Sequence, residues 1–237
     1  MNGNPLTRRV LKHKVFELLR LNDIDRVLAG LDTLPPRRAV NPLFSYIQNS
    51  DPEIKWKAVT GMGAVTAKLA DGNMESARVV IRRLMWNLND ESGGIGWGSP
   101  EAMGEILASN EALADEYFRI LISYVRENGN FQAQKTMQRG IIWGIGRLSQ
   151  VRPCLIRYAS SHFPPYLGSP DATVRGITAW LIGLIGAVEV SSDLEPLTRD
   201  ETEIQIYIDR QLVKHQVKHL AKEALEKLNS RVINTSN

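Results

Sequence analysis

The chain has 237 residues, of which 43% are hydrophobic and 23% are charged, and its mean hydropathy is −0.21. These values exclude a disordered chain and predict a soluble protein with a substantial buried core. No apolar run approaches the roughly 18 residues of a membrane span, and the basic N-terminus has no stretch of signal-peptide length behind it. The single cysteine, Cys154, excludes an internal disulfide. We therefore expect a cytoplasmic protein without a membrane association.

Apolar residues recur at three-to-four spacing almost throughout, and long alternating segments are nearly absent, so the sequence predicts an all-α fold. A first helix is expected over residues 5–21. A second helix is expected from Asn22, as its N-cap, to about residue 32, before a pair of prolines. We predict that residues 1–35 form an N-terminal helical cap, that residues 36–230 form a repeat array continuous with it, and that residues 231–237 are disordered.

A repeat is visible in the second helices of the array, expected over residues 53–69, 100–109, 131–149 and 171–188. Each contains a glycine, and Gly63, Gly104, Gly146 and Gly183 are separated by 41, 42 and 37 residues. A period near 40 with two helices per unit is typical of a right-handed α-solenoid. Because glycine inside a helix costs about 1 kcal/mol relative to alanine, four in register predict close packing between neighbouring helices.

The last unit departs from the helical pattern. Ile204, Ile206 and Ile208 alternate with polar residues before Asp209, which predicts a small β-hairpin over residues 203–213. A closing helix is expected over residues 214–228.

The segments 51–55 and 169–175 carry a resemblance to a known family. Asp-Pro-Glu-Ile-Lys leads to Ala58 and Gly63, and Ser-Pro-Asp-Ala-Thr-Val-Arg leads to Ala179 and Gly183. Both are similar to the loop aspartate, basic helix opening and small residue of HEAT repeats, particularly the degenerate type named after phycobilisome lyases. The resemblance implies an armadillo-like helical fold with binding surfaces, and it does not imply catalysis.

Positions equally displaced from the repeat glycines should be neighbours on successive second helices. This register gathers aromatic and charged side chains in adjacent columns, which predicts a binding groove on the concave face. Its candidate residues are Trp56, Trp97, Glu101, Glu105, Arg139, Trp143, Arg147 and Trp180. The alternative is that the tryptophans fill the space between helix layers.

A basic stripe is formed by Lys135, Arg139, Trp143 and Arg147, which follow one another at i, i+4 steps. No Asp or Glu occurs from residue 128 to residue 170, whereas five bases do. Bases with an interleaved aromatic ring suit a nucleic-acid backbone with a stacked base. The alternative is a solvated face neutralised by neighbours, for example through a Glu105–Arg147 pair.

The least repeat-like segment is a glycine-rich loop before the second helix at residue 100. It contains Asp90, Glu91, Gly93, Gly94, Gly96 and Gly98, and Ser99 is expected to cap the helix that follows. The carboxylates of Asp90, Glu91, Glu101 and Glu105 could hold a hard cation, although the spacing is not that of an EF-hand. We interpret the loop as a structural or recognition element that inserts Trp97 between two helices, and we expect no metal and no cofactor.

These patterns predict a non-enzymatic scaffold that uses the concave face to bind a protein or peptide, since aromatic and arginine side chains dominate protein interfaces. The alternative is nucleic-acid binding through the basic stripe. The size and repeats are also similar to the alkylpurine DNA glycosylases, whose pattern of tryptophans and a carboxylate would fall on Trp86, Trp97 and Asp90 or Glu91. A third alternative, chromophore attachment or maturation of another protein, has only the lyase-type repeat behind it.

Overall fold

The computed structural model describes residues 7–89 and 96–235, and the chain divides into two compact units, Met1–Asn110 and Glu111–Asn237. Both units are helical, and the second also contains a two-stranded antiparallel sheet. Within the described ranges, no helix combines the length and the apolar character needed to cross a membrane.

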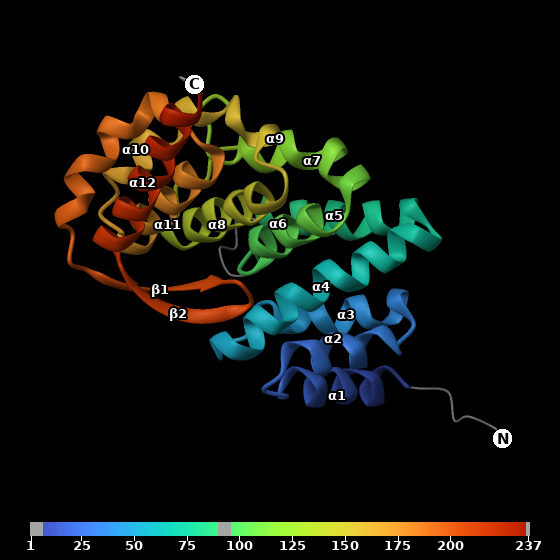
Figure 1. Cartoon of the computed structure of the whole chain (residues 1–237). Helices are drawn as coiled ribbons and strands as arrows, with labels where there is room; N and C mark the ends of the chain where they lie inside the picture. The colour runs from blue at the N-terminus through green and yellow to red at the C-terminus, as the bar shows by residue number, and fades with distance from the viewer. Residues whose placement is uncertain (1–6, 90–95, 236–237) are drawn as a thin grey trace. The chain divides into compact units, whose positions relative to one another are not determined.

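The first unit is a series of packed helices (Figure 1). Helix α4 is its centre, because α2, α3, α5 and α6 all pack against it. The helices are α1 (Arg8–Leu19), α2 (Ile24–Asp32), α3 (Pro36–Tyr46), α4 (Pro52–Gly72), α5 (Met74–Leu88) and α6 (Ser99–Ser109).

Short polar side chains set where these helices begin. Asp51 accepts a hydrogen bond from the backbone N–H of Glu53 and caps α4, and Asn73 caps α5 in the same way through Ser76. Helix α2 is capped by Asp23 and not by Asn22, because the Asp23 carboxylate accepts from the backbone of residues 25 and 26. Because a cap satisfies N–H groups that have no partner within the helix, these side chains fix the first turns.

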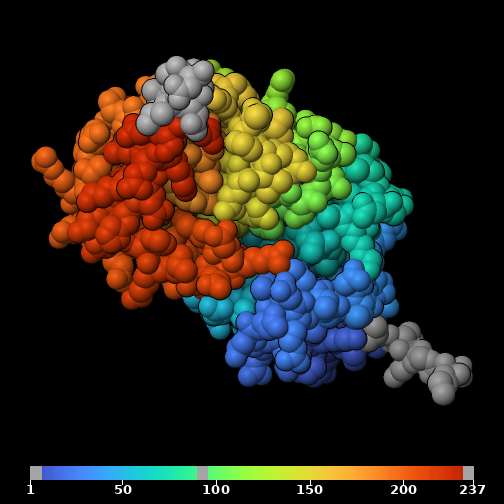
Figure 2. All heavy atoms as spheres, viewed as in Figure 1, coloured from blue at the N-terminus to red at the C-terminus, as the bar shows by residue number. Residues whose placement is uncertain are grey.

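The second unit is centred on α11, which packs between α8 and α12 (Figure 1). In the space-filling view, the orange and red segments that include η2, the hairpin and α12 form a continuous surface (Figure 2). The elements are α7 (Glu111–Ser123), α8 (Lys135–Val151), α9 (Cys154–Arg157), η1 (Ser160–His162), α10 (Pro164–Leu167), α11 (Ala172–Ile185), η2 (Val188–Arg199), β1 (Glu203–Ile208), β2 (Gln211–Gln216) and α12 (Val217–Thr235).

The predicted hairpin is present and longer than expected. Strands β1 and β2 pair in an antiparallel register from Glu203 opposite Gln216 to Ile208 opposite Gln211. The two turn residues, Asp209 and Arg210, have φ values of 49° and 64°, as a type I′ turn requires. Because β2 pairs through residue 216, the closing helix begins at residue 217 and not at residue 214.

The glycines of the second helices do mark close approaches. A Cβ atom on Gly63 would lie 2.6 Å from Cγ of Glu105 on α6, and one on Gly183 would lie 2.9 Å from Cα of Ala224 on α12. A Cβ on Gly146 would collide with the ring of Trp180 on α11. The predicted close packing is therefore confirmed at these three positions.

The C-terminal end of the chain differs from the expected disordered tail, because α12 continues to Thr235. Arg231 anchors this part of the helix, since its guanidinium donates a hydrogen bond of 3.3 Å to the Leu184 carbonyl oxygen. The same side chain lies against Gly186, the left-handed residue that ends α11 with a φ of 68°. The helix therefore extends beyond residue 231, where the sequence predicts that the tail begins.

Both units contain many buried apolar side chains. Those of the first unit include Val15, Leu19, Val27, Leu43, Ile47, Met62, Ile81, Leu84 and Ile106. Those of the second include Leu121, Tyr124, Ile141, Ile145, Phe163, Leu181, Ile182, Val217 and Leu220.

Replacing Gly183 by valine tests whether the glycine register is a packing requirement. We expect Gly183→Val to lower the free energy of unfolding by roughly 1–3 kcal/mol, because the new side chain must displace the backbone of α12. Urea denaturation measures the effect, and Gly72→Val is the matched control because a Cβ there meets no atom within 4 Å. Equal stability of Gly183→Val and the unmodified protein would contradict the close-packing account.

Candidate functional site

Two of the predicted groove tryptophans belong to the core of the second unit. Trp143 is 2% exposed, and its indole N–H donates a hydrogen bond of 2.7 Å to the Tyr207 carbonyl oxygen on β1. Trp180 is 6% exposed and occupies the space that Gly146 leaves open. These two side chains therefore do not present rings to a partner, and the alternative that they fill space between helices is the correct one.

Glu101, one of the predicted groove residues of the first unit, forms a partly buried ion pair with Lys55. Lys55 Nζ lies 2.7 Å from Oε1 of Glu101 and 5.1 Å from the ring centre of the half-buried Trp56. Glu101 and Glu105 are 5% and 6% exposed, and Oε2 of Glu101 has no hydrogen-bond partner within the described part of the chain. These carboxylates therefore lie within the packed helices and not on an open surface.

The glycine-rich loop is described only at its C-terminal end. Gly98, with a φ of 77°, begins α6 in place of the expected Ser99 cap, and its Cα faces the Ile47 carbonyl so closely that no side chain would fit. Trp97 is 47% exposed, so it does not insert between helices as predicted. The other candidate residues of the loop, namely Asp90, Glu91, Gly93 and Gly94, lie outside the described residues, and Gly96 accepts a hydrogen bond from Ser99.

The basic stripe is largely occupied by internal contacts. The Arg139 guanidinium pairs with Asp171 at 2.6 Å, Arg147 donates to the Gln150 amide oxygen at 3.5 Å, and Lys135 donates to the Gln138 amide oxygen at 3.2 Å. The acid that pairs with Arg139 is the first residue after the acid-free segment. Trp143 is buried and Arg139 pairs with a carboxylate, so the stripe does not present an exposed ring for stacking. Glu105 lies in the first unit and Arg147 in the second.

Asp171 has two functions at the start of α11. Its Oδ1 accepts from the backbone N–H groups of Thr173 and Val174, and its Oδ2 accepts from Arg139. Burial alone would raise the pKa of this carboxyl, but the hydrogen bonds and the positive charge hold its pKa below the ordinary 3.8. Asp171 is therefore ionised at neutral pH.

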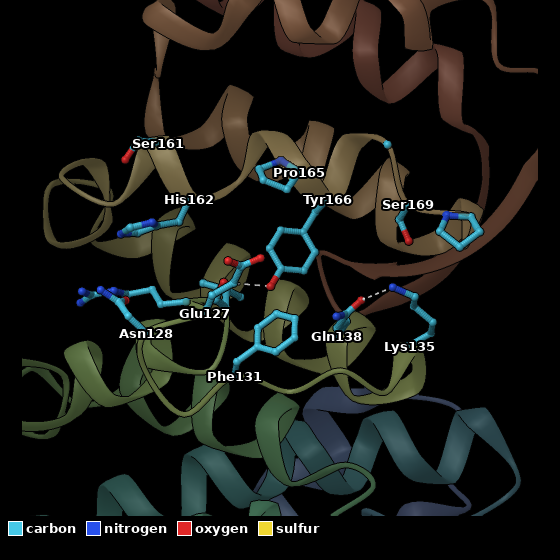
Figure 3. Close-up of a pocket in the computed structure, with 14 residues that line it drawn as sticks. Glu127, Asn128, Phe131, Lys135, Gln138, Ser161, His162, Pro165, Tyr166 and Ser169 are labelled. Carbon is cyan, nitrogen blue, oxygen red and sulfur yellow. Dashed lines mark hydrogen bonds between the residues drawn. The ribbon is translucent and has the colours of Figure 1, made fainter.

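A pocket of about 650 Å³ lies in the second unit and includes Lys135 of the basic stripe, although the sequence predicted no pocket there (Figure 3). It is formed where the turn after α7 faces the irregular segment from η1 to the start of α11. Its lining residues are Val125, Arg126, Glu127, Asn128, Phe131, Lys135, Gln138, Ser161, His162, Pro165, Tyr166, Gly168, Ser169 and Pro170.

The pocket combines a fixed wall with exposed groups at its edge. The Tyr166 hydroxyl donates a hydrogen bond of 2.9 Å to the Val125 carbonyl oxygen, and burial together with the nearby Glu127 raises the pKa of Tyr166 to about 12. Tyr166 therefore stays neutral and joins α10 to the end of the α7 segment. In Figure 3 the ring of Phe131, which is 40% exposed, points toward this tyrosine.

Polar donors complete the pocket. Lys135 retains N–H donors beyond its bond to Gln138, and Nε of Arg126 is buried without a hydrogen-bond partner among the described residues. The acid-free segment contributes most of the lining, so its charge pattern was a signal for this region. Residues 153–170 form short helices and turns that interrupt the helical period, so the periodicity of the sequence did not indicate a pocket.

No family model matches the chain, and no curated protein matches it. Solved structures do match. An engineered protein is 12% identical with a TM-score of 0.54, over 93% of this chain and 96% of that one. A designed armadillo repeat protein is 17% identical with a TM-score of 0.51, over 92% and 100% of the two chains. A designed armadillo repeat protein in complex with a (KR)4 peptide is 16% identical with a TM-score of 0.54, over 92% and 99%.

At these identities the matches show the fold alone. The chain has the α-solenoid fold of armadillo-like helical repeats, with a small antiparallel hairpin near its C-terminus. The predicted fold class is confirmed.

The Asp171 carboxylate gives a pH-dependent prediction. We expect Asp171→Asn to lower the free energy of unfolding by about 1 kcal/mol at neutral pH, because asparagine keeps the cap but loses the pair with the half-exposed Arg139. A lowered pKa stabilises the fold above the unfolded value, so the difference between the two proteins should shrink as pH falls below about 4. Urea denaturation across pH measures it.

Glu203→Gln is the control for this prediction, since Glu203 and Lys214 form a pair whose side chains are 59% and 71% exposed. Exposed pairs contribute little, so this variant should keep its stability. An equal loss in both variants would contradict the role given to Asp171.

Proposed function

We propose that this protein is a non-enzymatic binding scaffold whose second unit holds an extended peptide segment of a partner protein. The pocket at Phe131, Lys135 and Tyr166 is the observation that carries the proposal. Its volume suits several peptide side chains, and an exposed aromatic ring beside charged donors is the composition of energetically dominant interface sites.

In this proposal the walls of the pocket have different roles. Phe131 and Pro165 offer an apolar surface for one side chain of the peptide, and both are exposed. Asn128 and Lys135 lie at the edge and provide donors for backbone carbonyls or a carboxylate. Tyr166 is already hydrogen-bonded, so it fixes the shape of the pocket and does not exchange partners.

The fold supports this function at a coarse level. One neighbour of the same fold is a designed armadillo repeat protein in complex with a (KR)4 peptide, so such repeats serve as peptide-binding frameworks. Its basic ligand is not the one proposed for this pocket. The lining includes two bases, Arg126 and Lys135, and one carboxylate, Glu127. This balance of charges favours a neutral or acidic segment.

We also propose that the repeats are of the HEAT-like type. Asp51 and Asp171 both cap their helices, and the basic residues four positions later, Lys55 and Arg175, both form ion pairs. These shared roles support the resemblance between segments 51–55 and 169–175.

Selection of peptides from a random displayed library against the full-length protein tests the pocket. We expect the selected peptides to bind at least about tenfold more weakly to Phe131→Ala and to Lys135→Glu, because these changes remove the apolar wall and reverse the charge at the edge. Fluorescence anisotropy measures the dissociation constants.

Two variants outside the pocket serve as controls. Tyr158→Ala removes a ring that is 57% exposed, and Lys222→Glu reverses an exposed charge on α12. Binding that is lost equally in the controls and the pocket variants would overturn the proposed site. Failure to select any peptide that responds to the pocket variants would do the same.

A further inference from the structure

A second surface, in the first unit, combines two arginines with aliphatic side chains. Helices α3 and α5 leave a groove of about 220 Å³ between them, and each contributes residues at i, i+3, i+4 and i+7. The residues from α3 are Arg37, Val40, Asn41 and Phe44; those from α5 are Ser76, Val79, Val80 and Arg83; Leu69 of α4 lies with them.

The two arginines span this groove in opposite directions. Arg37 on α3 donates to the Ser76 hydroxyl on α5, with Nε at 3.2 Å and Nη2 at 2.5 Å. Arg83 on α5 donates from Nη1 to the Asn41 amide oxygen on α3 at 2.6 Å, and its guanidinium lies 3.9 Å from the centre of the Phe44 ring. Both guanidinium groups are therefore held in place beside an apolar floor.

Neither guanidinium has a carboxylate partner within the part of the chain that the structure describes, because each bonds only to neutral oxygens. The acid on this face of α5, Glu75, is shared by Arg78 and Arg82. A guanidinium has five N–H donors, so Arg37 and Arg83 retain several for a ligand. Fixed, uncompensated guanidinium groups are suited to bidentate binding of carboxylates.

Apolar side chains continue along the open side of the groove. Val79, Arg83 and Trp86 follow one another at i, i+4 and i+7 on α5, so they share a face. Val79 is 53% exposed and Trp86 is 75% exposed. Tryptophan and arginine are the residue types most enriched at sites that dominate binding energy.

We propose that this groove binds a partner segment in which an aliphatic side chain is flanked by carboxylates. The aliphatic group would fill the space above Val40 and Val80, and the carboxylates would pair with Arg37 and Arg83. The volume is smaller than the roughly 300–1,000 Å³ of small-molecule sites, so it suits one or two side chains of a protein. This site is separate from the pocket proposed above and does not depend on it.

The probe is a short fluorescein-labelled peptide with two adjacent leucines flanked by Asp and Glu, tested by anisotropy against the full-length protein. We expect binding to weaken at least about tenfold when Arg37→Gln and Arg83→Gln are combined, because glutamine can still hydrogen-bond but carries no charge. Arg9→Gln combined with Arg26→Gln is the matched control, since both arginines are exposed helix residues of the same unit. This control should bind as the unmodified protein does.

A second pair of variants tests the apolar part. Val79→Asp places a carboxylate at the mouth of the groove, whereas Val10→Asp does so at an equally exposed position, 51%, on α1. We expect at least about a tenfold loss for Val79→Asp and none for Val10→Asp, with circular dichroism confirming that both fold.

Altered peptides identify what is recognised. Replacing the leucines by alanine, or the acids by Asn and Gln, should each abolish most of the binding. The proposal is overturned if the alanine peptide binds equally well, if labelled DNA or anionic lipid vesicles compete as strongly as the peptide, or if the groove variants behave as their controls. Variants of Phe131 and Lys135 should leave this binding unchanged, which separates it from the pocket.

Discussion

The close approach of successive second helices determines which side chains of each unit remain available for binding. At Gly146 the absence of a side chain lets the ring of Trp180 enter the helix interface, and at Gly183 the backbone of α12 comes near enough that no larger residue fits. Interiors packed at this density have no room for partly inserted ligands. The aromatic side chains next to these glycines therefore stabilise the fold, and binding must use side chains that the contacts leave outside.

Several bases of the second helices are likewise used in contacts within the fold. At the starts of the second helices, Lys55 pairs with Glu101, Arg139 with Asp171, and Arg175 with Asp200. Each acid is distant in sequence from its base, so counting charges along a segment overestimates the positive charge that a ligand would meet. Arg37 and Arg83 differ from these three bases, because among the described residues the fold holds them through neutral groups. A fixed cation without a carboxylate is a stronger indication of an anionic partner than a row of bases.

The sequence predicted those elements whose structure depends on the spacing of residues along the chain. The glycine register located the second helices α4, α6, α8 and α11, and the alternating isoleucines located β1. The sequence did not reveal that Trp143 is buried, because its indole N–H bonds to the carbonyl of Tyr207 on a strand more than sixty residues away. It also missed the pocket at Tyr166, because a non-periodic segment forms one wall and a turn near residue 128 forms the other.

The two candidate surfaces differ in which of their side chains already form hydrogen bonds within the protein. In the pocket of the second unit, Tyr166 and Gln138 are buried and hydrogen-bonded, so in the proposed site specificity would come from Phe131, Lys135 and Asn128 at the edge. In the groove between α3 and α5, the arginines themselves join the helices, so the groups that hold the helices together are also those that would contact the proposed ligand. A ligand carboxylate that pairs with them would add to a contact already ordered in the free protein. Preorganised donors lose less conformational entropy on binding, which would strengthen the binding of the proposed acidic segment in this groove.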